Sequence, residues 1–202
     1  MKHRGVFFVL VATSLIFASL SATASSRLDS LLSLCDGCHG QDGNSKKEEV
    51  PSIAGFSVFY LADALRMYKA GERESVSYRI EGQEETDMNQ IAGLLSDADR
   101  LALAKHYAGM TFIPHQQAFK SEWAKRGEKV HQYYCEKCHA EGGTSPENDA
   151  AILAGQWTKY LRRQFKQFAS GKRLMPRGME RYFVTLTKQD KEALIHYYAS
   201  QY

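Results

Sequence analysis

The four cysteines of the chain all lie in two short motifs, Cys35–His39 and Cys135–His139, which share the form Cys-x-x-Cys-His. Thiols at this spacing can add to the two vinyl groups of a haem, and the histidine that follows can bind its iron from the proximal side. A redox-active thiol pair and half of a zinc site have the same cysteine spacing. The zinc interpretation is weakened because the two thiol pairs lie 100 residues apart.

The two motifs therefore predict two covalently bound haem c groups. An iron that passes electrons without binding small molecules needs a sixth ligand, and a thioether raises its reduction potential relative to a second imidazole. Met88 and Met179 each stand seven residues before a Leu-Ser or Leu-Thr pair, in polar, loop-like stretches where a core-filling methionine is less expected. Met175, beside Pro176, remains the alternative in the second stretch. The predicted site comprises the attachment thiols Cys35, Cys38, Cys135 and Cys138 and the axial ligands His39, Met88, His139 and Met179.

No other group of side chains indicates catalysis or a second metal. The chain has no combination of nucleophile and base, no phosphate-binding loop and no dinucleotide fingerprint. Four further histidines have no carboxylate cluster beside them, and we interpret them as surface or partly buried residues: His106, His115, His131 and His196. We therefore expect an electron-transfer protein that is not an enzyme by itself.

An internal repeat relates the two motifs. A shift of 100 positions superimposes the first motif on the second and Gly71 on Gly171, and beyond this glycine a shift of 91 pairs Met88 with Met179. The first copy thus holds nine extra residues within the polar stretch Glu72–Asp87, which predicts a surface loop. The repeat predicts two similar domains, residues 25–113 and 114–202.

Helical patterns recur at matching places in both copies. Apolar side chains at helical spacing precede each motif, and central helices are predicted over Phe56–Ala70 and Trp157–Ser170. Each copy ends in a helix that begins at a capping-box pattern, Ser96-x-x-Asp99 or Thr187-x-x-Asp190. Gly127 either lets the first and last helices of the second copy approach closely or simply interrupts a helix. No segment shows sustained strand alternation, so the predicted fold class is all-α.

Residues 1–24 have the pattern of a signal peptide. The positive segment Lys2–Arg4 precedes the apolar run Gly5–Leu20 and a small-residue cleavage site, so we expect cleavage between Ala24 and Ser25. A retained membrane anchor is the alternative, although the apolar run is shorter than the roughly 20 residues that a spanning helix needs. No later stretch predicts a membrane span in the mature chain. Together with haem, these features predict a periplasmic protein.

The charge gives no support for nucleic-acid binding, because the formal net charge is only +3. Residues 25–113 hold 9 basic and 14 acidic side chains, whereas residues 114–202 hold 15 basic and 9 acidic ones. This asymmetry either orients a partner as it approaches or reflects two solvated surfaces that happen to differ.

Residues 35–45, residues 51–55 and the repeat together resemble dihaem cytochromes of the cytochrome c4 type, over the whole mature chain. Residues 86–89, 134–139 and 152–157 look more narrowly like the cytochrome subunit of flavocytochrome c sulfide dehydrogenase. The resemblance implies two tandem class I cytochrome c domains related by a pseudo-two-fold axis. It also implies, as partner, an FAD-containing sulfide dehydrogenase subunit or another redox protein.

The resulting expectation is a haem subunit that accepts electrons from a sulfide-oxidising flavoprotein. The alternative is a free cytochrome c4-like shuttle that relays electrons to a terminal oxidase or reductase. A third hypothesis, a catalyst with an open iron, requires a vacant sixth position.

Overall fold

The computed structural model describes residues 26–79 and 84–202, in which the regular secondary structure is helical apart from two isolated β-bridges. The predicted all-α class is therefore confirmed, whereas the predicted signal peptide, residues 1–24, lies outside the described residues. None of the described helices has both the length and the apolar character that crossing a membrane requires.

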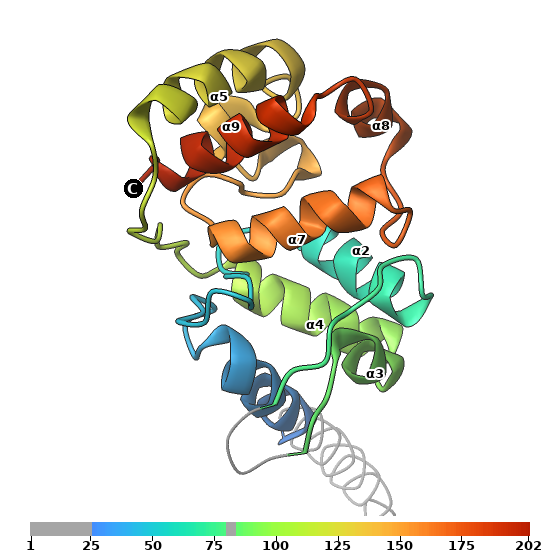
Figure 1. Cartoon of the computed structure of the whole chain (residues 1–202). Helices are drawn as coiled ribbons and strands as arrows, with labels where there is room; N and C mark the ends of the chain where they lie inside the picture. Colours follow the sequence, from blue (N-terminus) through green and yellow to red (C-terminus); the bar gives the residue numbers. More distant parts are fainter. Residues whose placement is uncertain (1–25, 80–83) are drawn as a thin grey trace, which may run out of the picture.

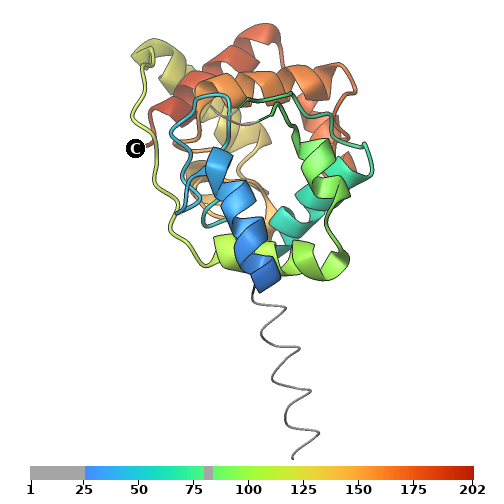
Figure 2. The same ribbon diagram turned by 90° about the horizontal axis from the view of Figure 1, so that it is seen from below.

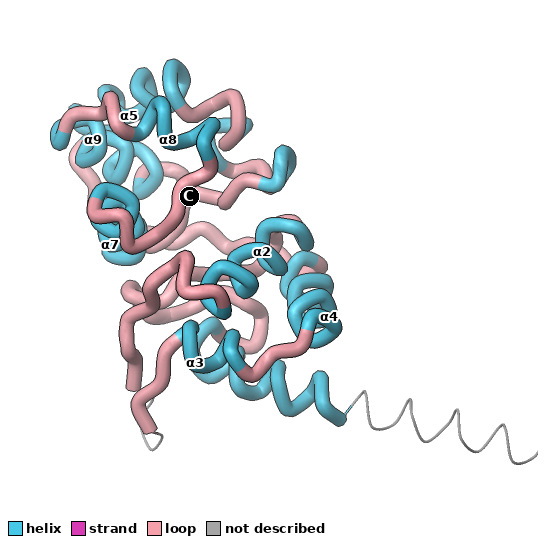
Figure 3. Tube along the Cα trace, turned by 90° about the vertical axis from the view of Figure 1, so that its right-hand side faces the viewer, coloured by secondary structure: helices cyan, strands magenta, loops and turns pink. Residues whose placement is uncertain are grey.

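The helices form two halves, one above the other (Figure 1), and a view from the side shows the same division (Figure 3). The first half contains helical residues 26–39, α2 (Val58–Lys69), α3 (Met88–Gly93) and α4 (Asp97–Ala108), arranged in a ring (Figure 2). The second half contains α5 (Ser121–Tyr134), α6 (Ala140–Gly143), the 3₁₀ turn η1 (Glu147–Asp149), α7 (Thr158–Ala169), α8 (Arg177–Phe183) and α9 (Lys188–Ala199). One cluster of buried apolar side chains lies within the second half, and a second cluster fills the first half and also includes Ile152 of the second half.

The last helix of each half begins at the predicted capping box. The hydroxyl of Ser96 accepts a hydrogen bond from the N–H of Asp99, and the Asp99 carboxylate accepts one from the N–H of Ser96, at 3.1 and 2.8 Å. Thr187 and Asp190 repeat this pair of bonds at the start of α9, both at 3.1 Å. Each box satisfies backbone N–H groups that a helix leaves unpaired, so both predicted starts are confirmed.

In the second half, the first and last helices cross at Gly127. A Cβ atom built on this residue of α5 would lie 2.1 Å from the carbonyl oxygen of Ala193 and 2.7 Å from Cβ of Tyr197, both in α9. Only a residue without a side chain fits such a crossing. Of the two readings of Gly127, the structure therefore supports close approach of the helices.

The residues two positions after the repeated glycines Gly71 and Gly171 meet where the halves join. Arg73 and Arg173 form an antiparallel bridge, flanked by hydrogen bonds from Glu74 N–H to the Lys172 carbonyl and from Leu174 N–H to the Glu72 carbonyl, both 2.8 Å. The prediction of a surface loop over Glu72–Asp87 is wrong at this end, because Arg73 is only 3% exposed. Arg73 is buried because it pairs with the other half, and the polarity of the local sequence gives no sign of this pairing.

A second contact joins the halves beside the first motif. The side-chain amide of Gln156 accepts a hydrogen bond from the N–H of Ser52 at 3.1 Å and donates one to the Ser52 carbonyl at 2.9 Å. The indole N–H of Trp157 donates to the Ser45 carbonyl at 2.8 Å. Because these bonds involve buried backbone groups, separating the halves would leave those groups unpaired.

Candidate functional site

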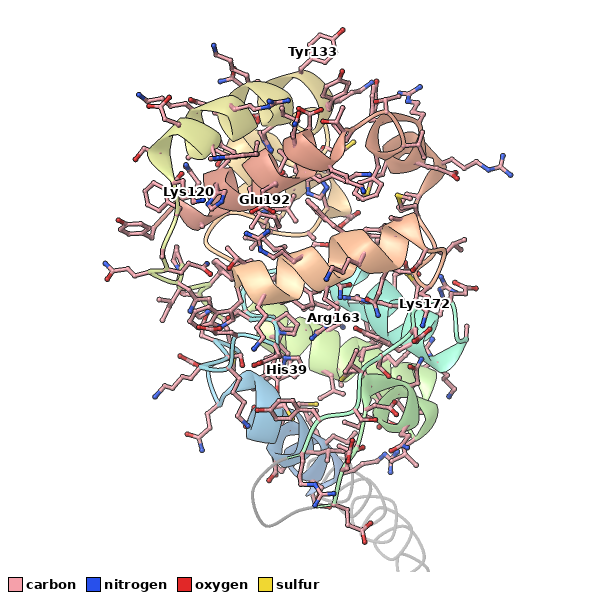
Figure 4. The ribbon with its side chains drawn as sticks, in the orientation of Figure 1. His39, Lys120, Tyr133, Arg163, Lys172 and Glu192 are labelled. Carbon is pink, nitrogen blue, oxygen red and sulfur yellow. The ribbon has the colours of Figure 1, made fainter. Side chains whose placement is uncertain are left out.

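The first motif lies at the end of a helix. Residues 26–39 are helical through the motif, so Cys35, Cys38 and His39 share one face. His39 is buried, and its Nδ1 lies 2.8 Å from the carbonyl oxygen of Pro51. Because a carbonyl can only accept a hydrogen bond, Nδ1 carries the proton, and Nε2 keeps a free lone pair for a metal. Figure 4 shows His39 in the first half, below Arg163 in that view.

The second motif reproduces this arrangement although its backbone forms a turn. The N–H groups of Cys138 and His139 both donate to the Cys135 carbonyl, at 3.1 and 2.9 Å. The Nδ1 atom of His139 lies 2.9 Å from the carbonyl oxygen of Ala151, the residue that corresponds to Pro51 in the repeat. Both histidines thus have the same tautomer, fixed by the same backbone position.

Each motif lines a cavity that also contains one predicted methionine. The first cavity, about 210 Å³, is lined by Cys35, Cys38, His39 and Met88 together with apolar side chains. The second, about 60 Å³, is lined by Cys135, Cys138, His139 and Met179. Met175 does not line the second cavity, although both Met175 and Met179 pack against the apolar cluster of the second half. Paired thiols, a neutral imidazole and a thioether around an apolar cavity fit a haem c group.

The two methionines stand on short helices rather than in loops, contrary to the sequence interpretation. Met88 is the first residue of α3, whose cap is the Asp87 carboxylate, bonded to the N–H groups of Asn89 and Gln90 at 2.8 and 3.0 Å. Met179 lies in α8, where its N–H donates to the Pro176 carbonyl at 2.9 Å. The Asp87 cap in α3 and the backbone bond to Pro176 in α8 thus hold the backbone that carries each sulfur.

Burial sets the protonation of the site residues. It is the main cause that lowers the pKa of His39 and His139, so both imidazoles are neutral, which is the metal-binding form. Burial also raises the pKa of the Cys35 and Cys135 thiols to about 11. Reactive redox thiols have a lowered pKa, so the structure disfavours the reading of the motifs as redox thiol pairs.

The second half completes the wall of the first cavity, which the sequence interpretation did not anticipate. Tyr160, Arg163 and Gln164 of α7 line it alongside residues of the first half. Figure 4 shows Arg163 on the side of α7 that faces the first half, and its guanidinium donates to the Glu49 carbonyl at 2.6 Å. The sequence predicted the helix itself. It could not predict that α7 covers the first cavity, because that contact depends on how the two halves pack.

His131 corrects another interpretation, because this histidine is fully buried, at 0% exposure. Its Nδ1 lies 3.0 Å from the Tyr198 hydroxyl, and its Nε2 lies 2.7 Å from the Glu136 carboxylate. In the first half, the corresponding Tyr107 hydroxyl donates directly to the Asp36 carboxylate at 2.7 Å. The repeat aligns Tyr107 with Tyr198 and Asp36 with Glu136. This alignment was the sequence signal that could have indicated a buried polar contact at His131.

Comparison with known proteins gives three kinds of match. The family described as cytochrome c oxidase, cbb3-type, subunit III matches residues 122–197. Cytochrome c4 of Stutzerimonas stutzeri is 30% identical over 181 residues, covering 82% of this chain and 83% of the relative. The thiosulfate dehydrogenase electron acceptor of Thiomonas intermedia is 27% identical over 154 residues, covering 69% of this chain and 64% of the relative. The crystal structure of reduced recombinant cytochrome c4 from Pseudomonas stutzeri superposes with a TM-score of 0.69 at 26% identity, covering 88% of this chain and 98% of that one.

Proposed function

Because the chain belongs to the cytochrome c4 family of dihaem c-type electron-transfer proteins, we propose that it is the electron-accepting subunit of a periplasmic enzyme that oxidises a sulfur compound. Two covalently bound haem c groups in tandem c-type domains supply the one-electron chemistry. In this proposal the attachment thiols are Cys35, Cys38, Cys135 and Cys138, and the axial ligands are His39, Met88, His139 and Met179.

The observation that supports this site best is the repeated bond between a proximal histidine and a backbone carbonyl. It holds the imidazoles of His39 and His139 in one tautomer and one orientation, and in each cavity lining a single methionine accompanies the histidine. A fixed pair of ligands keeps a redox centre from rearranging when its charge changes, which favours electron transfer over binding of small molecules.

We infer that the donor is a sulfide-oxidising flavoprotein. The support is the local likeness of residues 86–89, 134–139 and 152–157 to the cytochrome subunit of flavocytochrome c sulfide dehydrogenase. The first of these stretches includes Met88, and the second contains Cys138, which is exposed. An electron donor that docks beside Cys138 would therefore reduce the haem of the second half first.

The test is purification of the native protein from the cells that produce it. We expect a flavin-containing polypeptide to accompany it and sulfide to reduce both haems in the complex. Thiosulfate, added in place of sulfide, is the matched control. Isolation of the protein without flavin, together with haems that sulfide leaves oxidised in the presence of the candidate flavoprotein, would disprove this donor.

A second candidate donor is a thiosulfate dehydrogenase, which the relative from Thiomonas intermedia favours. In that case thiosulfate reduces the haems and sulfide does not. The free shuttle is the remaining alternative, favoured by the match to cytochrome c4. It requires fast oxidation by a terminal oxidase or reductase, with a rate that falls steeply as ionic strength rises.

A further inference from the structure

The polar stretch Glu72–Asp87, which contains the nine extra residues of the first copy, folds back along itself. We call its residues 74–78 and 84–87 the ribbon. Tyr78 and Thr86 form an antiparallel bridge across the ribbon, with backbone hydrogen bonds of 2.8 and 3.0 Å between them. Figure 3 shows the two segments side by side at the edge of the first half. The insertion is therefore a paired structure, and what it covers can be asked.

The ribbon forms part of the wall of the first cavity. Residues 74–78, Thr86 and Asp87 all line this cavity. In the second copy, the stretch that corresponds to Glu72–Asp87 and Met88 is residues 172–179, of which only Gly178 and Met179 line the second cavity. The first cavity therefore has a stretch of wall for which the second copy has no counterpart.

One side of the ribbon is bonded to the helix that carries Met88. The N–H of Ser75 donates to Oδ1 of Asn89 at 2.8 Å, and Nδ2 of Asn89 donates to the Arg73 carbonyl at 2.9 Å. The Ser75 hydroxyl donates at 2.7 Å to the Asp87 carboxylate, which also caps α3. These bonds hold the start of the ribbon beside the proposed sixth ligand.

The ribbon also contacts the first motif and the second half. The ammonium of Lys47 lies 4.8 Å from the centre of the Tyr78 ring, and it donates to the carbonyl of Gly37, inside the first motif, at 3.4 Å. The Glu74 carboxylate accepts from the ammonium of Lys172 at 2.8 Å. The ribbon thus extends from the methionine side of the first cavity to the thiol side, and it is held at three places.

The two motifs differ in exposure in the same sense. His39 is buried, whereas His139 is half-buried. Cys38 is half-buried, whereas Cys138 is exposed. The exposed side chain of Lys137 lines the second cavity. The second site can therefore be reached from the surface beside its motif, whereas the ribbon lies across the first site.

We propose that the ribbon screens the first haem from redox partners, so that electrons enter and leave the protein through the second haem and reach the first haem only from the second. The rate of electron tunnelling falls steeply with the distance between donor and acceptor. A partner that docks on the ribbon stays a layer of protein away from the first haem, whereas one that docks beside Cys138 lies next to the second. The proposal rests on the proposed haem sites and holds for any donor, whether or not it oxidises sulfide.

The first experiment measures how closely a solute approaches each haem of the isolated, reduced dihaem protein. The probe is a neutral gadolinium chelate, which broadens NMR resonances with the inverse sixth power of distance. Met88→Ala and Met179→Ala assign the haem methyl resonances, because each should alter those of one haem only. We expect the chelate to broaden the methyl resonances of the second haem several-fold more than those of the first.

Equal broadening of the two haems, or stronger broadening of the first, would overturn the proposal. A haem whose resonances respond to neither methionine variant would disprove its proposed site, and the proposal with it. Failure of sulfide to reduce the protein affects neither result, so the donor and the screen are tested separately.

Variants of the ribbon test whether it is the screen. Val76→Gly combined with Tyr78→Ala removes two side chains that line the first cavity, and we expect the broadening of the first haem to rise to that of the second. Arg79→Ala is the matched control, because this exposed neighbour does not line the cavity, and it should leave the broadening unchanged. If the double variant does not hold haem, Tyr78→Ala alone replaces it. No rise in broadening, or an equal rise in the control, would contradict the proposal.

The electron route is tested by the rate at which hexacyanoferrate(III), a small anionic oxidant, oxidises the reduced protein. Lys137→Ser removes a positive charge beside the second cavity, and Ser77→Glu adds a negative charge beside the first. At low ionic strength we expect Lys137→Ser to slow the reaction by about twofold or more and Ser77→Glu to slow it by less than about 1.3-fold. Equal slowing by the two variants, or slowing by Ser77→Glu alone, would show that electrons leave through the first haem and would overturn the proposal.

Discussion

The imidazole of His115 stacks on the indole of Trp157, with ring centres 3.9 Å apart and planes inclined by 12°. His115 belongs to the segment that connects the halves, and its Nε2 lies 2.8 Å from the Ser52 hydroxyl. The stack thus holds the connecting segment against the second half. It lies where Gln156 and Trp157 form their hydrogen bonds with the first half.

This contact predicts a pH dependence of stability. Burial lowers the pKa of His115, so the folded protein favours the neutral imidazole. The stabilisation is complete above the unfolded pKa of about 6.5 and is lost as the pH falls below it, because the unfolded chain then takes up the proton more readily. His115→Phe keeps a flat ring on Trp157 but cannot titrate.

We therefore expect the urea midpoint of His115→Phe to fall less than that of the wild type between about pH 7 and pH 5. All other histidines are present in both proteins, so the difference reports on His115. Identical slopes would show that His115 contributes nothing to the pH dependence.

The helix crossing at Gly127 predicts a strong effect of one methyl group. Gly127→Ala should lower the free energy of unfolding by about 1–3 kcal/mol, because the new Cβ would force α5 away from Ala193. Gly93→Ala is the matched control, since a Cβ on this helical glycine meets no atom within 4 Å. Urea unfolding measures both, and equal stability of the two variants would contradict the crossing.

The proposed sixth ligands predict a spectroscopic result. Met88→Ala should remove the sulfur-to-iron absorption band of one haem and Met179→Ala that of the other, each with a lower potential. Met175→Ala should leave both bands in place, because Met175 does not line the second cavity. A band that survives Met179→Ala but disappears in Met175→Ala would identify Met175 as the ligand.

The capping boxes predict two matched losses of stability. Ser96→Ala and Thr187→Ala should each lower the free energy of unfolding by about 1 kcal/mol, because each removes the side chain that accepts from a helix N–H group. Ser121→Ala changes an exposed residue at the start of α5, which has no side-chain cap, and should cost less than about 0.5 kcal/mol. Losses no larger than that of Ser121→Ala would rule out a stabilising role for the boxes.

The repeat and the local motifs predicted much of this architecture. Ser96 and Thr187 were recognisable because a capping box is encoded within four residues. The helices α3 and α8 were not predicted, because helices of 6 and 7 residues are too short to show a periodic pattern.

Burial was harder to predict than secondary structure. Arg73 stands in a polar stretch, and only its pairing with the other half makes it an interior residue. His131 was interpreted as exposed or partly buried because its partners, Tyr198 and Glu136, come from another helix and from the second motif. Contacts between distant parts of the chain decide such positions.

The part of α7 that closes the first cavity has a consequence for how such a protein can change over generations. After a duplication, two copies of a small unit can normally drift apart or be exchanged singly. Here three residues of the second copy, Tyr160, Arg163 and Gln164, line the cavity of the first copy. A substitution in the second copy therefore alters the environment of the first. Replacing the second copy alone would therefore remove part of the wall of the first cavity, so the two copies are constrained to change together.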